Sequence, residues 1–197
     1  MSKYKLIVIC GKSAAGKDTF LQGMLKTIGE NVNEIISYTT RPPREGEVDG
    51  KNYHFITEDE FLRKIWYKEM LETAKYRDWW YGTALDSLKK DKINIGVFNR
   101  KGVESLLQNS KDIDIFIVQI MASDKTRLLR ALHREEHPDV DEIVRRYEAD
   151  KIEWENFDQT DLYINNDYDD VASHIMTATV ARILEEAGKL WAELANK

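Results

Sequence analysis

A glycine-rich segment near the start of the chain has the residues and the spacing of a phosphate-binding loop. The run from Gly11 to Lys17 reads GKSAAGK and fits the pattern G-x-x-x-x-G-K. Small residues at this spacing let consecutive backbone N–H groups surround an anionic phosphate, and the closing lysine adds a positive charge for the β- and γ-phosphates of a nucleotide. We therefore predict a nucleotide-phosphate site, with an ordinary glycine turn as the alternative. Its predicted residues are Gly11, Lys12, Ser13, Ala14, Ala15, Gly16, Lys17, Asp18 and Thr19.

The residue after the loop lysine departs from the usual pattern. A serine or threonine hydroxyl normally follows the lysine and reaches Mg²⁺, whereas this chain has Asp18 followed by Thr19. The Asp18 carboxylate could ligate the ion directly or through a water. It could instead serve the first turn of the helix, where negative charge is favourable. Both interpretations stand at this point. Mg²⁺ is the cofactor that we expect, with Asp18 and Thr19 as its candidate ligands.

A second cluster of phosphate-binding residue types lies between residues 37 and 50. Arg41 and Arg44 flank two prolines, which hold the two guanidinium groups in a stiff fork. Guanidinium groups bind phosphate with paired hydrogen bonds and do not lose their charge. Ser37 and Tyr53 add hydroxyl donors on either side. The segment therefore indicates a second phosphate site; a solvated basic turn is the alternative.

The same segment carries a long motif that resembles the guanylate kinase family. Residues 37–55 match S-x-T-T-R-x-P-R-x-G-E-x-x-G-x-x-Y-x-F, which is similar to that family's GMP-binding signature. Further similar motifs are Met70-Leu71-Glu72, Tyr81-Gly82-Thr83, Arg130 with Arg134, Ile143 with Arg146, and Ile164-Asn165-Asn166-Asp167. The likeness covers residues 5–185. It implies a kinase that uses ATP as co-substrate and phosphorylates GMP or dGMP to GDP or dGDP by in-line phosphoryl transfer.

The resemblance also implies roles for individual residues. Those expected to hold the acceptor phosphate are Ser37, Arg41, Arg44, Tyr53 and Tyr81. Glu72 would accept the N1–H and 2-amino hydrogens of guanine, and Thr83 would bind O6. Only guanine presents two adjacent donors beside a carbonyl on that edge, so adenine would leave Glu72 facing an acceptor nitrogen. Without the flanking motifs, a surface carboxylate would be the better interpretation of Glu72.

Two arginines further along the chain share one face of an expected helix, because Arg130 and Arg134 lie four residues apart. The family likeness places them with Arg146 in a lid over the transferring phosphoryl group. The charge that spreads over its oxygens calls for cations more than for covalent partners, and lid closure excludes water. An exposed helix with ordinary i,i+4 ion pairs is the alternative. The expected catalytic residues are Lys17, Arg41, Arg130, Arg134 and Arg146.

One family motif is missing from the chain. Where the family usually has D-x-D-x-Q-G, residues 97–102 read VFNRKG, so both acids are absent. In the family these acids belong to the acceptor pocket and to the surroundings of the metal. Their absence leaves open another (deoxy)nucleoside monophosphate as acceptor, and Asp18 could return one of the carboxylates. A catalytically inactive interaction module is a further alternative, although such modules typically lack an intact loop. Arg100 and Lys101 are expected to face solvent at a helix start.

The elements that must position these residues alternate along the chain. Apolar runs predict strands at 5–10, 35–40, 70–76, 93–98, 113–122 and 162–165. Helical spacing predicts helices at 17–28, 58–66, 84–90, 102–108, 125–134, 140–157 and from 168 onward. This alternation predicts an α/β fold, with a P-loop NTPase-type parallel sheet core flanked by helices. We expect one domain, 1–197, with a core of 1–36, 89–125 and 149–197, an inserted NMP-binding subdomain at 37–88 and a helical lid at 126–148.

Composition bounds the remaining properties. Hydrophobic residues make up 42% of the 197 residues and charged residues 32%, with three prolines, which excludes a disordered or collagen-like chain. The single cysteine, Cys10, excludes an internal disulfide and favours a reducing compartment, so we expect a cytoplasmic protein. The net charge of -6 disfavours polymeric nucleic acid. No apolar run approaches the roughly 20 residues that span a bilayer, and the start does not resemble a signal peptide. Small nucleotides are the expected partners of a monomer or homodimer.

Overall fold

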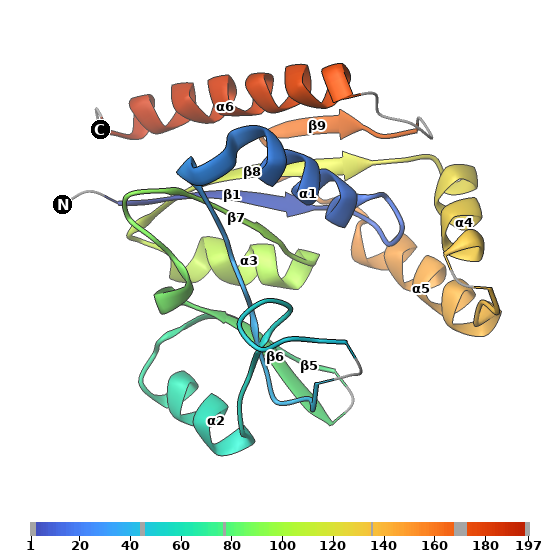
Figure 1. The fold of residues 1–197 in the computed structure, drawn as a ribbon, viewed down its shortest axis with the longest axis horizontal. Coiled ribbons are helices and arrows are strands. Elements are labelled where there is room, and N and C mark those ends of the chain that lie inside the picture. The colour runs from blue at the N-terminus through green and yellow to red at the C-terminus, as the bar shows by residue number, and fades with distance from the viewer. Residues whose placement is uncertain (1–2, 44–45, 77, 135, 168–172, 196–197) are drawn as a thin grey trace. The chain divides into compact units, whose positions relative to one another are not determined.

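The computed structural model describes residues 3–43, 46–76, 78–134, 136–167 and 173–195, which form two sheets and the helices around them (Figure 1). The five-stranded sheet has the order β2-β7-β1-β8-β9, and the four-stranded sheet has the order β4-β3-β6-β5. The strands are β1 (Tyr4–Cys10), β2 (Val32–Glu34), β3 (Tyr38–Thr39), β4 (His54–Phe55), β5 (Met70–Tyr76), β6 (Trp79–Ala84), β7 (Ile93–Val97), β8 (Ile113–Met121) and β9 (Leu162–Asn165). The α-helices are α1 (Lys17–Ile28), α2 (Glu58–Trp66), α3 (Arg100–Asn109), α4 (Asp124–His133), α5 (Val140–Glu153) and α6 (Ser173–Ala195), and short 3₁₀ turns cover Gly29–Asn31 and Leu85–Ser87.

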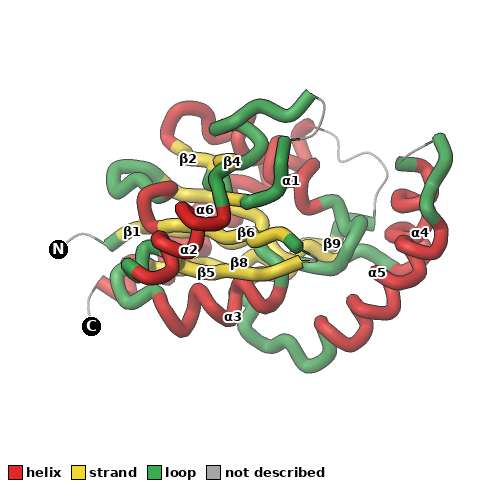
Figure 2. Tube along the Cα trace, turned by 90° about the horizontal axis from the view of Figure 1, so that it is seen from below, coloured by secondary structure: helices red, strands yellow, loops and turns green. Residues whose placement is uncertain are grey.

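The residues group into two units, each with contacts of its own. The first unit holds Met1–Leu6, Glu30–Gly96 and Lys101–Ile115. Within it β2 pairs with β7 and β3 with β4, both in parallel, whereas β6 pairs antiparallel with β3 and β5. Figure 2 shows β5 and β6 as long neighbouring strands. Helix α2 packs on β6 through Phe61, which is fully buried and stacks on Trp80 with ring centroids 5.9 Å apart.

The second unit is built around apolar helix faces. It holds Ile7–Gly29, Val97–Arg100 and Phe116–Lys197. Here β8 pairs with β9 in parallel, and α1 packs against α6 (Figure 1). Phe20 and Met24 of α1 and Val180 and Ile183 of α6 are buried. Burial raises the pKa of the Cys10 thiol to about 12, so this side chain stays neutral and serves as a small core residue.

The predicted α/β fold class is confirmed by the parallel five-stranded sheet and its helices. Most predicted bounds agree with the structure to within two residues, including those of β1 and α1, which frame the phosphate loop. The onset of the last helix, predicted at 168, lies partly outside the described residues, and α6 is described from Ser173.

The helix predicted at 84–90 is wrong. Ala84 continues β6, where it pairs with Met70, and only one 3₁₀ turn follows at Leu85–Ser87. The backbone N–H of Lys89 donates to the side-chain oxygen of Asn94 at 2.8 Å. That side-chain acceptor takes the place of a helical carbonyl, so the turn does not propagate.

The strand predicted at 35–40 is also wrong in its limits, because β2 lies at Val32–Glu34 and β3 covers only Tyr38–Thr39. The sequence signal of β2 is weak because its buried member is polar: Asn33 donates to the carbonyl of Ser87 and to the side chain of Asn94. Strands β4 and β6 were not predicted. The helix predicted at 140–157 ends earlier, at Glu153, and shortly afterwards Asn156 adopts a left-handed conformation with φ 56°.

The first turn of α2 provides a test of local stability. The Thr57 hydroxyl accepts a hydrogen bond from the N–H of Glu60, while the Glu60 carboxylate accepts one from the N–H of Thr57, at 3.3 and 2.8 Å. This capping box satisfies two N–H groups that the helix leaves unpaired. We expect Thr57→Ala to lower the free energy of unfolding by about 1 kcal/mol in chemical denaturation.

A threonine in the last turn of another helix serves as the control. Thr27 is exposed in α1, and its hydroxyl donates to the carbonyl of Gly23 within the same helix. Thr27→Ala should leave stability nearly unchanged, because alanine is the better helix former and this bond adds little to the helix. Equal losses in the two variants would contradict the capping role of Thr57.

Candidate active site

Two glycines allow the phosphate loop to run close to other parts of the second unit. Gly11 has φ +139°, and a Cβ at this position would lie 2.3 Å from the carbonyl oxygen of Ile120 in β8. Gly16 has φ +92°, and its Cβ would lie 2.4 Å from Nδ2 of Asn166. A side chain would therefore clash at both positions, so glycine is required. The loop has the tight backbone path that its sequence pattern predicts.

Polar contacts fix the middle of the loop. The carbonyl oxygen of Lys12 accepts the N–H of Ala15 at 3.3 Å and the ammonium of Lys17 at 2.9 Å. The carbonyl of Ala15 accepts the side-chain amide of Asn166 at 2.8 Å and the guanidinium of Arg130 at 3.4 Å. The loop is thus shaped by contacts from α4 and from the segment after β9 as well as by its own residues.

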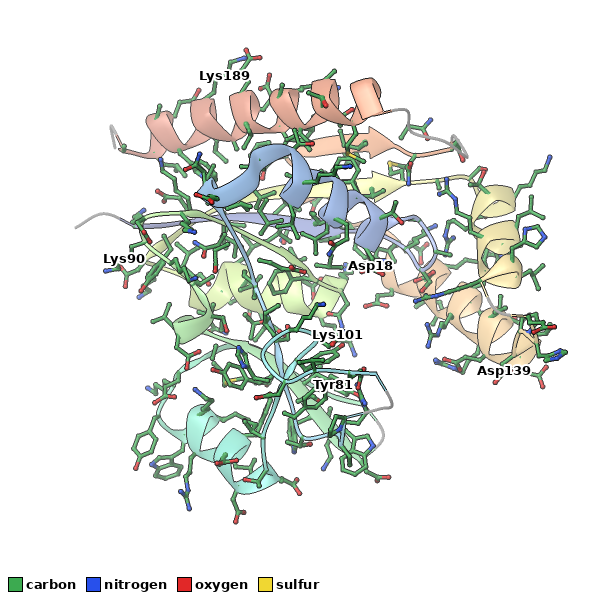
Figure 3. All side chains as sticks on the ribbon, viewed as in Figure 1. Asp18, Tyr81, Lys90, Lys101, Asp139 and Lys189 are labelled. Carbon is green, nitrogen blue, oxygen red and sulfur yellow. The ribbon has the colours of Figure 1, made fainter. Side chains whose placement is uncertain are left out.

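The start of α1 brings a half-buried cation, Lys17, beside an exposed carboxylate, Asp18. Burial lowers the pKa of Lys17, and the nearby carboxylates of Asp18 and Asp150 oppose that shift. The residue that caps the helix is Gly16, whose position carries no side-chain hydrogen bond, so Asp18 is not the N-cap. Asp18 lies in the first turn of α1 with its side chain exposed (Figure 3). A favourable interaction with the helix dipole therefore remains compatible with a role as metal ligand.

A cavity of about 680 Å³ opens beside the loop within the second unit. Its lining includes Lys17, Asp18 and Thr19 on one side and Arg130, Arg134 and Arg146 of the α4–α5 region on the other. A volume in this range is typical of small-molecule sites. The structure therefore brings the phosphate loop and the three expected lid arginines to one cavity.

The lid arginines differ in their surroundings. Arg130 is partly buried against the loop, whereas Arg134 directly follows α4 and is exposed. Arg146 donates to the carboxylate of Glu142 at 2.7 Å, and Arg145 donates to the same carboxylate. These two cations lower the pKa of Glu142 to about 2. The ordinary i,i+4 pair considered as the alternative is thus present at Arg146, in a residue that also lines the cavity.

Two residues that were not among the predicted site residues form a buried ion pair next to the phosphate loop. It is the most buried ion pair beside the loop in the described part of the chain. Arg127 of α4 and Asp150 of α5 form an ion pair with exposed fractions of 2% and 5%, and both contact Ser13. Their types and spacing match no local motif, since Asp150 lies 137 residues from Ser13. Only the folded chain could have revealed them.

The segment that lacks the two acids has a structural role at Arg100. Its guanidinium donates to the carbonyl oxygens of Glu153 and Glu155, and lies over the ring of Phe157 at 5.6 Å from the centroid. These carbonyls belong to the last residue of α5 and to the turn after it, where a cation is favourable. Arg100 opens α3 as expected but is half-buried by these contacts, while Lys101 is exposed.

The first unit holds the expected guanine-reading pair. Glu72 of β5 lies opposite Thr83 of β6 in the antiparallel register. The Thr83 hydroxyl lies 3.2 Å from that of Ser37. Burial raises the pKa of Glu72, and the nearby backbone and hydroxyl of Thr83 oppose that shift. Glu72 is half-buried on its strand, so it is not a fully exposed surface carboxylate.

Arg41 is buried and fully engaged, with an exposed fraction of 8%. Its two terminal nitrogens bind the two carboxylate oxygens of Glu47, each at 2.9 Å, and this pairing raises the pKa of Arg41. The guanidinium also lies 5.7 Å from the centroids of the Tyr53 and Phe55 rings. The solvated-turn alternative is wrong for this arginine, and Glu47 is a partner that the sequence analysis did not name.

The aromatic residues of this site lie close together, since the Tyr53 and Tyr81 rings meet edge to face with centroids 6.0 Å apart. Tyr81 lies near Arg41 and contributes to raising its pKa, and its position is labelled in Figure 3. Arg44, the other member of the expected arginine fork, lies outside the described residues. All other expected acceptor-site residues are described, and all belong to the first unit.

Within the described part of the chain, no three acidic, histidine or cysteine side chains gather as a metal cluster. A magnesium ion that accompanies a nucleotide needs only one or two protein carboxylates, because phosphate oxygens and waters complete its shell. The exposed carboxylate of Asp18 at the cavity fits that requirement. Among the described helices, none is long and apolar enough to cross a membrane.

Comparison with known proteins places these features in a family. A family model described as "Guanylate kinase" matches residues 3–185. The guanylate kinase of Helicobacter hepaticus is 33% identical over 191 residues, covering 94% of this chain and 93% of that protein. The guanylate kinase of Thermotoga maritima is 36% identical over 180 residues, covering 89% and 86%.

The fold has a counterpart among solved structures. The crystal structure of guanylate kinase from Anaplasma phagocytophilum matches with a TM-score of 0.63 at 20% identity, over 94% of this chain and 86% of that one. This likeness concerns the fold alone, whereas the family model and the relatives above 30% identity concern the sequence over most of its length. The chain therefore belongs to the guanylate kinase family of nucleoside-monophosphate kinases.

Proposed function

We propose that this protein transfers the γ-phosphoryl group of ATP to GMP or dGMP and releases ADP and GDP or dGDP. The observation that carries the proposal is the pairing of Glu72 with Thr83 in the first unit. A carboxylate beside a hydroxyl matches the two donors and the carbonyl on one edge of guanine. Other bases would leave a buried polar group of this pair without a partner.

The donor nucleotide would occupy the cavity beside the phosphate loop. Backbone N–H groups of the loop and the ammonium of Lys17 would bind its phosphates, and Arg130, Arg134 and Arg146 would stabilise the charge of the transferring group. Mg²⁺, when bound, neutralises phosphate charge; Asp18 and Thr19 are the residues that would hold it. Support comes from the cavity lining, which joins all these residues in one unit.

The acceptor phosphate would bind to Ser37, Arg41, Arg44, Tyr53 and Tyr81. Two hydrogen bonds to the Glu47 carboxylate, together with the neighbouring aromatic rings, hold the Arg41 guanidinium in one orientation before any ligand binds. Such preorganisation lowers the entropy that binding must remove from a long side chain. It also places a permanent cation where the acceptor's charge is expected.

The domain plan that goes with this activity is one domain, 1–197, with an NMP-binding subdomain at 37–88 and a lid at 126–148. Its partners would be small nucleotides rather than polymeric nucleic acid or a membrane. We propose a cytoplasmic monomer or homodimer. The single, buried cysteine supports a reducing compartment.

A kinase for another (deoxy)nucleoside monophosphate is the second candidate, and one observation favours it. The segment from Val97 to Gly102 lacks the two acids of the family motif, and Arg100 at its centre serves the end of α5. An inactive interaction module is less well supported, because the loop keeps its glycines, its lysine and a cavity beside them.

A panel of acceptors tests the activity and separates these candidates. With Mg²⁺-ATP and a coupled assay of ADP release, we expect turnover with GMP and dGMP well above that with AMP, CMP, UMP or dTMP. Preference for another member of the panel would support the second candidate. Absence of turnover with every acceptor would overturn the kinase proposal and favour the interaction module.

Substitution of Glu72 separates its function from its effect on stability. Glu72→Gln should reduce kcat/KM for GMP by about 100-fold or more, since two hydrogen bonds to a charged acceptor are lost or reversed. Burial raises the pKa of Glu72 in the folded chain above its value in the unfolded chain. Ionised Glu72 therefore lowers the free energy of unfolding at pH values above that raised pKa. The variant should therefore be at least as stable as the wild type at pH 7 in thermal or chemical unfolding.

The same pKa shift predicts a pH profile. In the wild type, kcat/KM for GMP should fall on acidification at a pH above the usual range of a glutamate, as Glu72 takes up a proton. Glu69→Gln is the control, because Glu69 is exposed just before β5 and pairs only on the surface with Lys64 at 3.3 Å. An unaltered preference for GMP in Glu72→Gln would refute the role of Glu72.

The proposed metal contact of Asp18 can be tested by magnesium titration. Asp18→Ala should sharply raise the Mg²⁺ concentration needed for half-maximal rate at fixed ATP, because a carboxylate ligand is lost. Asp59→Ala is a matched control: Asp59 is also an exposed aspartate in the second position of a helix, here α2. Identical titrations for the wild type and Asp18→Ala would show that Asp18 serves only the helix.

A further inference from the structure

The two helices that follow β8 are joined by a buried ion pair. Arg127 of α4 donates through Nη2 to the carboxylate of Asp150 of α5, and both side chains are almost fully buried. Arg127 uses its other nitrogens as well: Nη1 donates to Asp124 at 2.9 Å, and Nε donates to the carbonyl of Ser13 at 2.9 Å. Every nitrogen of this guanidinium therefore has an assigned partner, an arrangement that the single ammonium of lysine cannot reproduce.

The same pair holds one residue of the phosphate loop by all of its polar groups. The N–H of Ser13 donates to Oδ2 of Asp150 at 2.9 Å, and the Ser13 hydroxyl donates to Oδ1 at 3.3 Å. The Ser13 carbonyl accepts from Nε of Arg127. Ser13 is thus bound through its amide, its carbonyl and its side chain, which fixes the orientation of two successive peptide groups of the loop.

Asp150 acts on the site from behind the loop. Ser13 and Arg127 contribute to the lining of the cavity, but Asp150 does not belong to that lining among the described residues. Its carboxylate therefore has no direct access to a nucleotide in the cavity. Any effect of Asp150 on nucleotide binding must pass through Ser13, through Arg127 or through its charge near Lys17.

The pair also connects the loop to two of the lid arginines. Arg130 lies three residues after Arg127 on α4, and Arg146 lies four residues before Asp150 on α5, so each is about one turn away from the pair. Helices α4 and α5 lie side by side in Figures 1 and 2. The ion pair braces these helices against each other and against the loop at the level where Arg130 and Arg146 leave them.

Stability alone does not account for such a pair. Removing two charges from water is unfavourable, and apolar residues of similar size in place of a buried ion pair are often neutral or stabilising. A geometric role explains why charged groups occupy these positions, because apolar side chains could pack there but could not bind the Ser13 peptide groups. The contacts point to the conformation of the loop as the property that the pair determines.

We propose that Arg127 and Asp150 are positioning residues, which hold Ser13 and the phosphate loop in the conformation that binds the donor's phosphates. This inference rests on the proposed function, since it assumes that the loop binds a nucleotide triphosphate. Neither residue needs to touch the nucleotide. The pair acts before binding, by keeping the loop's N–H groups convergent.

The double variant Arg127→Leu with Asp150→Leu tests the proposal, because it can preserve folding while it removes the tether. We expect its stability in chemical denaturation to equal or exceed that of the wild type. Its affinity for ATP and for inorganic tripolyphosphate, measured by calorimetry, should fall about 10-fold or more, since small displacements at such sites are costly. Tripolyphosphate isolates the loop from contacts with the base. The KM for GMP should change little.

Two further variants keep the test decisive if the double variant does not fold. Asp150→Asn keeps an acceptor for the Ser13 N–H but loses the charge that binds Arg127. It should therefore weaken tripolyphosphate binding, but by less than the double variant does. Asp161→Asn is the matched control: Asp161 likewise accepts a backbone N–H, from Ile117 at 2.7 Å, but this contact joins β8 to the segment before β9. It should leave tripolyphosphate affinity unchanged.

The outcomes separate this inference from the proposed function. Wild-type affinity for tripolyphosphate in the double variant, or in Asp150→Asn if that is the variant that folds, would show that the pair is only structural. The same loss in Asp161→Asn as in Asp150→Asn would also overturn the inference. A wild-type protein that binds neither ATP nor tripolyphosphate would overturn the proposed function and this inference with it.

Discussion

A Cβ atom at position 11 would clash with the carbonyl oxygen of Ile120. A Cβ atom at position 16 would clash with the side-chain amide of Asn166. These two close approaches constrain the rest of the second unit. The loop can pass only with glycine at both places, and it runs here between the end of β1 and the start of α1. The ammonium of Lys17 donates to the loop's own carbonyl at Lys12 and is half-buried. A compact anion site follows from backbone geometry before any side chain contributes.

Buried charges at both sites are balanced locally, although the chain as a whole carries -6. Lys17 has the carboxylates of Asp18 and Asp150 nearby, and Arg41 is paired with Glu47. Each cation is thereby fixed in place and kept charged while it is removed from water. The net charge of the whole chain therefore does not describe the surroundings of these two cations. Composition favours small ligands over polyanions as an expectation, but it could not locate the paired groups.

Local sequence was sufficient wherever a function depends on neighbouring residues. The loop, α1 and the β5 segment with Glu72 were predicted with correct limits, because their signals are contiguous or periodic. The helix predicted at 84–90 fails for a local reason, because the Asn94 side chain accepts the N–H of Lys89. Other failures arise from partners distant in sequence. The carbonyls of Glu153 and Glu155 accept from Arg100, more than fifty residues earlier. The Arg127–Asp150 pair converges on Ser13 from more than a hundred residues away. No pattern along the chain reveals such contacts, since each depends on topology.

The position of Arg100 bears on how an acceptor can be selected without the missing acids. Its guanidinium fastens the carboxyl end of α5 through Glu153 and Glu155, and Asp150, one turn earlier, fastens the same helix to the phosphate loop. The last turn of α5 is thus held from two sides, and Arg146 leaves the helix one turn before this anchored part. A segment that supplies carboxylates in the family serves here to hold the helix that carries Arg146, a residue of the cavity lining. The proposed recognition of guanine therefore rests on Glu72 and Thr83, which lie opposite each other in the register of β5 and β6.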